Sequence, residues 1–188
     1  MCRIMSVISR FVALSVLAGP LLLSAESAQA PCDVNAKILR ARTFATTGDP
    51  HRWKEYKSIA DVPELDTDGG QSAQVWHDNQ GRPLVYTVEP GEDFWTYTRY
   101  CFDKSGQLTR VGFEVRTAWG WGYRLEGAVL GGALHPHSSG FFDTENGQPI
   151  EKPKDADGVP GALTPKLYPT FSKLPFARLF YAASATTH

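Results

Sequence analysis

The sequence predicts an α+β fold, mostly an antiparallel β meander of about five to seven strands with one or two short helices packed on it. Two observations predict the sheet: a turn motif that recurs three times, and stretches in which apolar and polar residues alternate. A third observation, apolar residues at helical spacing after Asp33, predicts the helical part. The 12% of aromatic residues agrees with a sheet, because aromatic side chains favour pleated, half-buried surfaces.

Residues 1–30 have the three parts of a secretory signal peptide. Two arginines provide a positive start, Phe11–Leu23 an apolar core, and Ala28–Ala30 a small-x-small cleavage site. The apolar core is shorter than the roughly 20 residues that a membrane-spanning helix needs. We therefore predict that residues 1–30 are cleaved and that residues 31–188 form a single globular domain without a transmembrane segment. This domain is expected to be exported to the periplasm or the extracellular space.

The chain has three cysteines, of which Cys2 lies in the predicted signal peptide, so the exported chain keeps Cys32 and Cys101. Disulfides form and persist in exported proteins, and we expect these two cysteines to pair. The bridge would close a loop of about 70 residues, which the chain-entropy model values at roughly 4 kcal/mol. The alternative is a reactive thiol at Cys101, which stands between two aromatic residues in an extended run.

The first part of the exported chain, residues 31–60, is predicted to be helical. Asp33 can cap a helix over Val34–Thr46, in which apolar residues recur at helical spacing. Gly48–Pro50 then breaks the chain. The aromatic residues of His51–Ala60 share one side at helical spacing, which predicts a second short helix.

A pattern of an aromatic residue, Asp, polar residues and Gly recurs within residues 73–151, the region that we predict to be the antiparallel sheet. The three copies are Trp76–Leu84, Phe102–Leu108 and Phe142–Ile150. The Asp side chain can accept hydrogen bonds from turn amides, and Gly adopts the positive φ of a tight turn. Each copy therefore predicts a β-hairpin rather than a ligand-binding loop.

Between the turns, alternation assigns two faces to each predicted strand. In Phe94–Phe102, the side chains at even positions lie opposite those at odd positions, beginning with Phe94 and Trp95. The partner stretch Arg110–Arg116 turns its valines and its phenylalanine inward and its charged residues outward. The tail, residues 152–188, is rich in Pro, Gly and charge and predicts an irregular wrap with a short helix near 176–182.

The hairpin Tyr100–Leu108, the strand Glu114–Thr117 and the closing segment Leu174–Leu179 resemble a group of uncharacterised exported bacterial proteins with repeated aromatic-Asp-x-x-Gly β-hairpins. The resemblance covers residues 73–181. It implies export and a sheet of hairpins, and no named activity, because the matching motifs are turn and packing residues. The Gly-rich segment 118–140 departs from the longer strand expected in this group, which leaves the number of strands open.

The stretch Trp119-Gly120-Trp121-Gly122-Tyr123 is the candidate binding surface. Its glycines remove neighbouring side chains, so the rings of Trp119, Trp121 and Tyr123 could offer flat apolar faces to a glycan or a protein. The alternative is that the tryptophans cap the core at a strand junction. The sequence leaves both interpretations open.

His135 and His137 stand two positions apart, so in an extended segment both could face one metal ion. Asp143, His51 or His77 would have to complete the site. A pair of surface histidines explains the same pattern. We therefore predict no cofactor and keep these histidines as a candidate metal site.

Glu114 and Glu126 fall on neighbouring predicted strands and could be the two carboxylates of a glycosidase. Arginines stand beside both, and cross-strand ion pairs on a wet face are the more common arrangement. Asp66–Gly69 and Asp155–Gly158 resemble fragments of calcium loops but lack the remaining oxygen ligands. The chain has no nucleophile elbow, zinc-protease helix or phosphate-binding glycine loop. We therefore assign no catalytic residue.

The chain carries 19 basic and 20 acidic residues, and the basic residues are scattered, so we predict no nucleic-acid partner. The absence of catalytic motifs favours a non-enzyme. The predicted function is a non-catalytic secreted or periplasmic binding or envelope-associated protein that uses an aromatic sheet surface. The alternative is a metal-dependent or carboxylate hydrolase that acts on an extracellular polymer.

Overall fold

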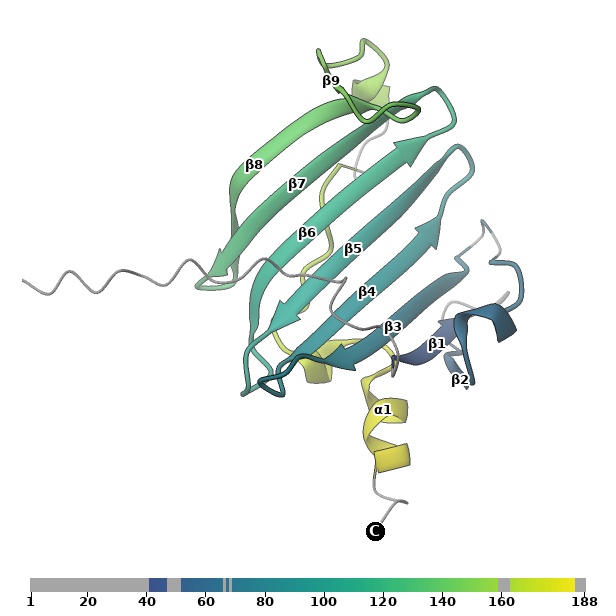
Figure 1. The fold of residues 1–188 in the computed structure, drawn as a ribbon, viewed down its shortest axis with the longest axis vertical. Helices are drawn as coiled ribbons and strands as arrows, with labels where there is room; N and C mark the ends of the chain where they lie inside the picture. The colour runs from purple at the N-terminus through teal and green to yellow at the C-terminus, as the bar shows by residue number, and fades with distance from the viewer. Residues whose placement is uncertain (1–40, 47–51, 66, 68, 159–162, 185–188) are drawn as a thin grey trace, which may run out of the picture. The chain divides into compact units, whose positions relative to one another are not determined.

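The computed structural model describes residues 41–46, 52–65, 67, 69–158 and 163–184. In this part of the chain, nine strands form one antiparallel sheet in the order β2-β1-β3-β4-β5-β6-β7-β8-β9 (Figure 1). The strands are β1 (Arg42–Thr46), β2 (Lys54–Tyr56), β3 (Gln71–His77), β4 (Pro83–Pro90), β5 (Phe94–Phe102), β6 (Leu108–Thr117), β7 (Trp121–Leu130), β8 (Ala133–Asp143) and β9 (Pro149–Ile150).

Helical structure is scarce in the described residues. There are three 3-10 turns, η2 (Ile59–Asp61), η3 (Ala156–Gly158) and η4 (Phe171–Lys173), and one α-helix, α1 (Ala177–Ser184). The predicted α+β class is therefore wrong: the fold is mainly β, with nine strands instead of five to seven. The short helix predicted near 176–182 is present as α1. None of the described helices is long and apolar enough to cross a membrane.

The two predicted N-terminal helices are wrong over most of the residues that the structure describes; only Ile59 and Ala60, at the end of the second, fall in a helical turn, η2. Residues 42–46 form β1, which pairs with β2 on one side and with β3 on the other. Within the second predicted helix, residues 54–56 form β2. Threonines at both ends of the Thr43–Thr46 run favour a strand, because β-branched side chains pack well on a pleated sheet. Residues 34–40 lie outside the described part of the chain.

The three turn motifs form β-hairpins, as predicted, and join β3 to β4, β5 to β6 and β8 to β9. In the second hairpin, the Asp103 carboxylate accepts hydrogen bonds from the backbone N–H groups of Ser105 and Gln107 at 2.8 and 2.9 Å. The Ser105 hydroxyl and these amides lower the pKa of Asp103 below its usual value. Gly106 adopts a φ of 79°. The local sequence therefore specifies this turn through both of its predicted features.

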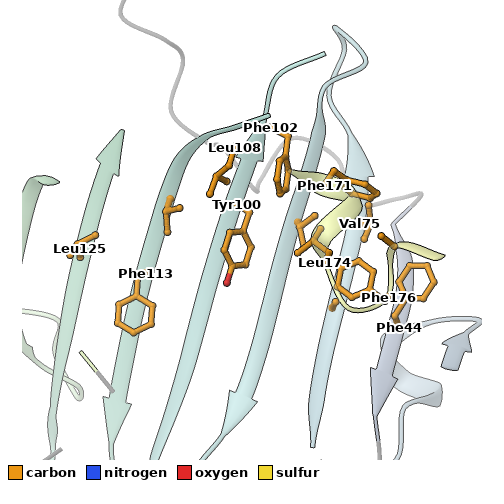
Figure 2. Packing of buried hydrophobic residues seen from close by; sticks show 14 of the residues in the cluster. Phe44, Val75, Tyr100, Phe102, Leu108, Phe113, Leu125, Phe171, Leu174 and Phe176 are labelled. Atoms are coloured by element: carbon orange, nitrogen blue, oxygen red, sulfur yellow. The ribbon is translucent and has the colours of Figure 1, made fainter. Parts of the chain in front are cut away.

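The two faces of the sheet differ in chemistry. On the apolar face, alternate residues of β6 such as Val111 and Phe113 are buried, whereas Glu114 and Arg116 lie on the opposite, charged face, as predicted. The C-terminal segment, residues 163–184, covers the apolar face and passes behind the sheet in Figure 1. Figure 2 shows its buried side chains, among them Phe176, directed toward those of the strands.

Gly122 of β7 is a position where a side chain does not fit. A Cβ atom there would lie 2.6 Å from the Val115 backbone oxygen and would also meet the ring of Phe142, which is 4% exposed. We expect Gly122→Ala to lower the free energy of unfolding by about 1–3 kcal/mol, because a packed side chain must move. Urea unfolding followed by tryptophan fluorescence measures this loss.

Gly140 of β8 provides the matched control for Gly122. A Cβ atom at Gly140 meets nothing within 4 Å, and the residue does not need a positive φ. Gly140→Ala is therefore expected to leave stability unchanged or to raise it slightly, since alanine restricts the unfolded chain. Equal losses in the two variants would contradict the close packing of Phe142 over Gly122.

Candidate functional site

A cavity of about 510 Å³ lies on the apolar face, between the sheet and the C-terminal segment. Strands β4, β5 and β6 form its sheet side, and residues 164–176 contribute the other side. Six aromatic side chains from segments far apart in the sequence line it: Trp53, Phe94, Tyr100, Phe113, Tyr168 and Phe176. A volume of this size is typical of small-molecule pockets, and the exposed lining of this one is about evenly divided between polar and apolar atoms.

The cavity exists because short hydroxylated side chains occupy the centre of the apolar face. Thr87 and Thr98 are paired across β4 and β5, and Thr96 is paired with Glu89. Elsewhere this face carries larger apolar side chains, which pack with the C-terminal segment in one cluster. Threonine projects less far from a sheet than phenylalanine or leucine, so space remains between the threonines and the C-terminal segment.

Two residues that line the cavity carry buried polar groups, of which one has a hydrogen-bond partner and the other has none among the described residues. The Tyr100 hydroxyl donates a hydrogen bond to the Lys166 carbonyl oxygen at 3.0 Å, which ties β5 to the C-terminal segment. Burial raises the pKa of Tyr100 far above its usual value, so this hydroxyl stays neutral. The indole N–H of Trp53 is buried and has no hydrogen-bond acceptor among the described residues. Because this nitrogen has almost no accessible surface, the contribution of Trp53 to the cavity comes from other atoms of its ring.

Charged groups stand at the edge of the cavity rather than inside it. Glu89 and Lys166 both line it and are exposed. The Lys166 ammonium lies 5.3 Å from the centre of the Tyr168 ring, a favourable cation–π distance. The described residues that line the cavity include no His and no Cys, the usual general base and the strongest nucleophile.

The predicted aromatic surface is divided between the core and the solvent. Trp121 is 4% exposed, and its indole N–H donates to a carboxylate oxygen of Asp155 at 3.1 Å. Trp119, in the turn between β6 and β7, is 50% exposed. Tyr123 is half-buried on the apolar face and packs against Phe141, with ring centres 5.1 Å apart. Of the three predicted binding residues, only Trp119 offers a widely exposed ring.

His135 and His137 are both exposed on β8. The pairing of β8 with β7 shifts register here: Pro136 faces Gly127 and Ser138 faces Glu126, which leaves His137 at a bulge. Among the described residues, no three His, Cys, Asp or Glu side chains are grouped closely enough to hold a metal ion. His51 and residues 66 and 68 lie outside the described part of the chain.

Glu114 and Glu126 are both engaged by arginines. Arg116 and Arg124 donate to the two carboxylate oxygens of Glu114 at 2.6 and 2.8 Å, and Arg99 pairs with Glu126. Partial burial alone would raise the pKa of Glu114, but the hydrogen bonds from the two arginines lower it below its usual value. A glycosidase acid needs a raised pKa. The geometry of Glu114 and Glu126 therefore does not support the hypothesis that these two carboxylates are the catalytic pair of a hydrolase.

No sequence motif marks Trp53, Tyr168 or Lys166 as site residues. They come from segments that were assigned to a helix and to an irregular wrap, and only the tertiary fold brings them together. A weaker signal was present in the strands, where Thr96 and Thr98 fall on a face that otherwise carries aromatic side chains. Such small polar residues on an apolar face indicate a place where the core is not filled.

No family model, no curated protein and no solved structure matches the chain. The resemblance to exported hairpin proteins therefore stays a prediction. The pairing of Cys101 with Cys32 does too, because Cys32 lies outside the described residues. The function of the protein is accordingly inferred from the geometry of its own cavity.

Proposed function

We propose that the protein is a non-catalytic binding protein that holds a small amphipathic molecule between the sheet and the C-terminal segment. The observation that carries the proposal is the cavity of about 510 Å³, which six aromatic side chains line. The predicted signal peptide adds export to the proposal, so the molecule would be taken up in the periplasm or outside the cell.

The chemistry of the walls indicates what such a molecule must carry. Aromatic rings around the cavity favour an apolar body, which gains about 25 cal/mol for each Å² removed from water. The threonines of β4 and β5 that line the cavity, among them Thr87 and Thr98, favour a polar end that can form hydrogen bonds. Lys166 at the edge adds a cation for an anionic group, which has to lie on the Lys166 side because Glu89 also stands at the edge. A molecule with an apolar body and one acidic end meets all of these requirements.

The proposal is tested with 1-anilinonaphthalene-8-sulfonate, a fluorescent probe with a flat apolar body and one anionic group. We expect saturable binding of one probe per chain, with competition by dodecanoate. Thr164 is exposed and lines the cavity from the C-terminal segment, so Thr164→Trp should fill the opening without disturbing the sheet. This variant is expected to bind the probe at least tenfold more weakly, a loss of about 1.4 kcal/mol or more.

Asn79→Trp is the matched control, because Asn79 is an exposed turn residue that does not line the cavity. It should bind the probe as tightly as the unchanged protein. Circular dichroism checks that both variants keep the sheet. Equal affinity in a folded Thr164→Trp variant would contradict binding in the cavity, and so would fluorescence that rises without saturation.

A further inference from the structure

The charged face of the sheet has a second hollow, of about 340 Å³, which shares no lining residue with the cavity. Five side chains line it: Tyr86, Tyr97, Arg99, Glu114 and Arg116. They come from β4, β5 and β6, where strand register pairs Tyr86 with Arg99 and Tyr97 with Glu114. We call this group the tyrosine–arginine cleft.

The cleft and its border carry more guanidinium groups than carboxylates. Arg116 and Arg124 share Glu114, each through its Nε–H, and Arg99 pairs with Glu126 through one terminal nitrogen. Gly112 of β6 is paired with Arg99 on one side and with Glu126 on the other. A Cβ atom at this position would lie 2.7 Å from both side chains, so the glycine leaves the space that the Arg99–Glu126 ion pair occupies. Three cations thus face two anions.

The arginines of the cleft keep donors that can bind a ligand. A guanidinium has five N–H groups. Arg99 uses one of its N–H groups in the ion pair with Glu126, and Arg116 uses one in the ion pair with Glu114. The two side chains are 37% and 49% exposed. Planar guanidinium donors of this kind fit a carboxylate in a bidentate manner. The remaining donors therefore form an anion-binding edge that is already oriented by the glutamates.

The tyrosines add flat surfaces beside this edge. The rings of Tyr86 and Tyr97 are nearly parallel, with an interplanar angle of 21° and centres 6.3 Å apart. The Arg116 guanidinium lies 6.0 Å from the centre of the Tyr97 ring. Burial raises the pKa of both tyrosines, so their hydroxyls stay neutral and can donate. A ligand ring that stacks on Tyr97 would therefore lie beside the Arg116 guanidinium.

Glu114 restricts the kind of anion that fits. Its carboxylate lines the cleft and carries a negative charge, since the pKa of this group is lowered by its arginines. It would repel a doubly charged phosphate, and it accepts hydrogen bonds from hydroxyl groups. A suitable ligand therefore combines one carboxylate, several hydroxyls and a flat apolar ring face. A sugar ring that bears a carboxylate has all three features.

We propose that the tyrosine–arginine cleft binds a uronic acid unit of an acidic saccharide. The carboxylate of the sugar lies against Arg99 and Arg116, its ring stacks on Tyr97, and its hydroxyls donate to Glu114. Such a site would let the protein attach to an acidic glycan through its charged face while its apolar face keeps the cavity free.

The test uses trigalacturonate and its methyl ester, which keeps the rings and removes the charges. Isothermal titration of the whole protein should detect trigalacturonate but not the ester, and binding should weaken as salt rises. Arg116→Gln and Tyr97→Leu are each expected to weaken binding at least tenfold. Arg178→Gln, an exposed arginine on α1, is the matched control and should bind normally.

Three results would overturn the proposal. One is equal binding of the acid and its methyl ester, which would remove the role of the arginines. The second is unchanged affinity in folded Arg116→Gln and Tyr97→Leu variants, which would place the site elsewhere. The third is inorganic phosphate binding as tightly as trigalacturonate, with no effect of Tyr97→Leu, which would reduce the cleft to a simple anion site. Probe binding in the cavity is measured separately, so either proposal can fail alone.

Discussion

Replacing Phe44 with alanine is expected to lower the free energy of unfolding by about 3–5 kcal/mol, the usual cost of removing a buried phenylalanine. Phe44 is fully buried on β1, and its ring stacks on Phe176 with centres 5.1 Å apart and an interplanar angle of 14°. Phe180 lies 6.3 Å away, and the Arg42 guanidinium lies 5.2 Å from the ring centre. The substitution therefore removes the stacked aromatic contact between β1 and the C-terminal segment and leaves the hydrogen bond from Arg42 to the Phe180 carbonyl oxygen.

Urea unfolding followed by circular dichroism measures the loss at Phe44, with thermal unfolding as a second readout. Leu130→Ala is the control, because Leu130 is 62% exposed at the end of β7 and its removal should change stability by less than about 0.5 kcal/mol. The midpoint of thermal unfolding should fall by about 10 °C in Phe44→Ala. A loss below about 1 kcal/mol would show that the C-terminal segment is not held by this aromatic cluster.

The sheet could be predicted from the sequence wherever its signals are local. The hairpin around Asp103 depends on hydrogen bonds within five residues, and the faces of β6 depend only on alternation. Both were predicted correctly for this reason. The segment that follows Trp119 was less regular because glycines interrupt the alternation, yet β7 and β8 each have at least ten residues. Pairing along two neighbouring strands compensates for weak strand preference at single glycines.

The N-terminal strands could not be predicted in the same way. Over a stretch as short as residues 42–46, apolar residues satisfy a helical and an extended spacing almost equally well. Tertiary pairing decides between them: β1 forms ladders on both sides, with β2 and β3, and buries Phe44 against the C-terminal segment. These partners are up to 132 positions away, so no local pattern contains the information.

The two candidate sites also differ in how far local patterns in the sequence predict them. The tyrosine–arginine cleft follows from alternation and register on three consecutive strands, and the sequence itself places Glu114 beside arginines. The cavity depends on how far the C-terminal segment stands from the threonines of β4 and β5. That spacing is set by Phe176 and its neighbours, which pack against β1 rather than against the threonines. The threonines mark in the sequence where the core is not filled, but no local pattern gives the distance of the C-terminal segment from them.

Removal of Cys32 is expected to lower the free energy of unfolding by about 4 kcal/mol, if Cys32 and Cys101 form the predicted bridge over about 70 residues. Cys101 is 8% exposed and packs with Trp76 and Leu84 on the charged face. Ala41, the first described residue, packs against the same cluster, so the chain reaches β1 close to Cys101. Cys32 lies nine positions before Ala41, a length of chain that can span about 30 Å.

Three variants of the chain beginning at Pro31 separate a bridge from simple packing: Cys32→Ala, Cys101→Ala and the double variant. A bridge is lost completely when either cysteine is removed, so the double variant should be hardly less stable than the single ones. Packing around Cys101 would instead leave Cys32→Ala stable and Cys101→Ala weakened. Thiol titration in denaturant without reductant should find no free thiol in the unchanged protein and one in each single variant. Two free thiols in the unchanged protein would refute the bridge.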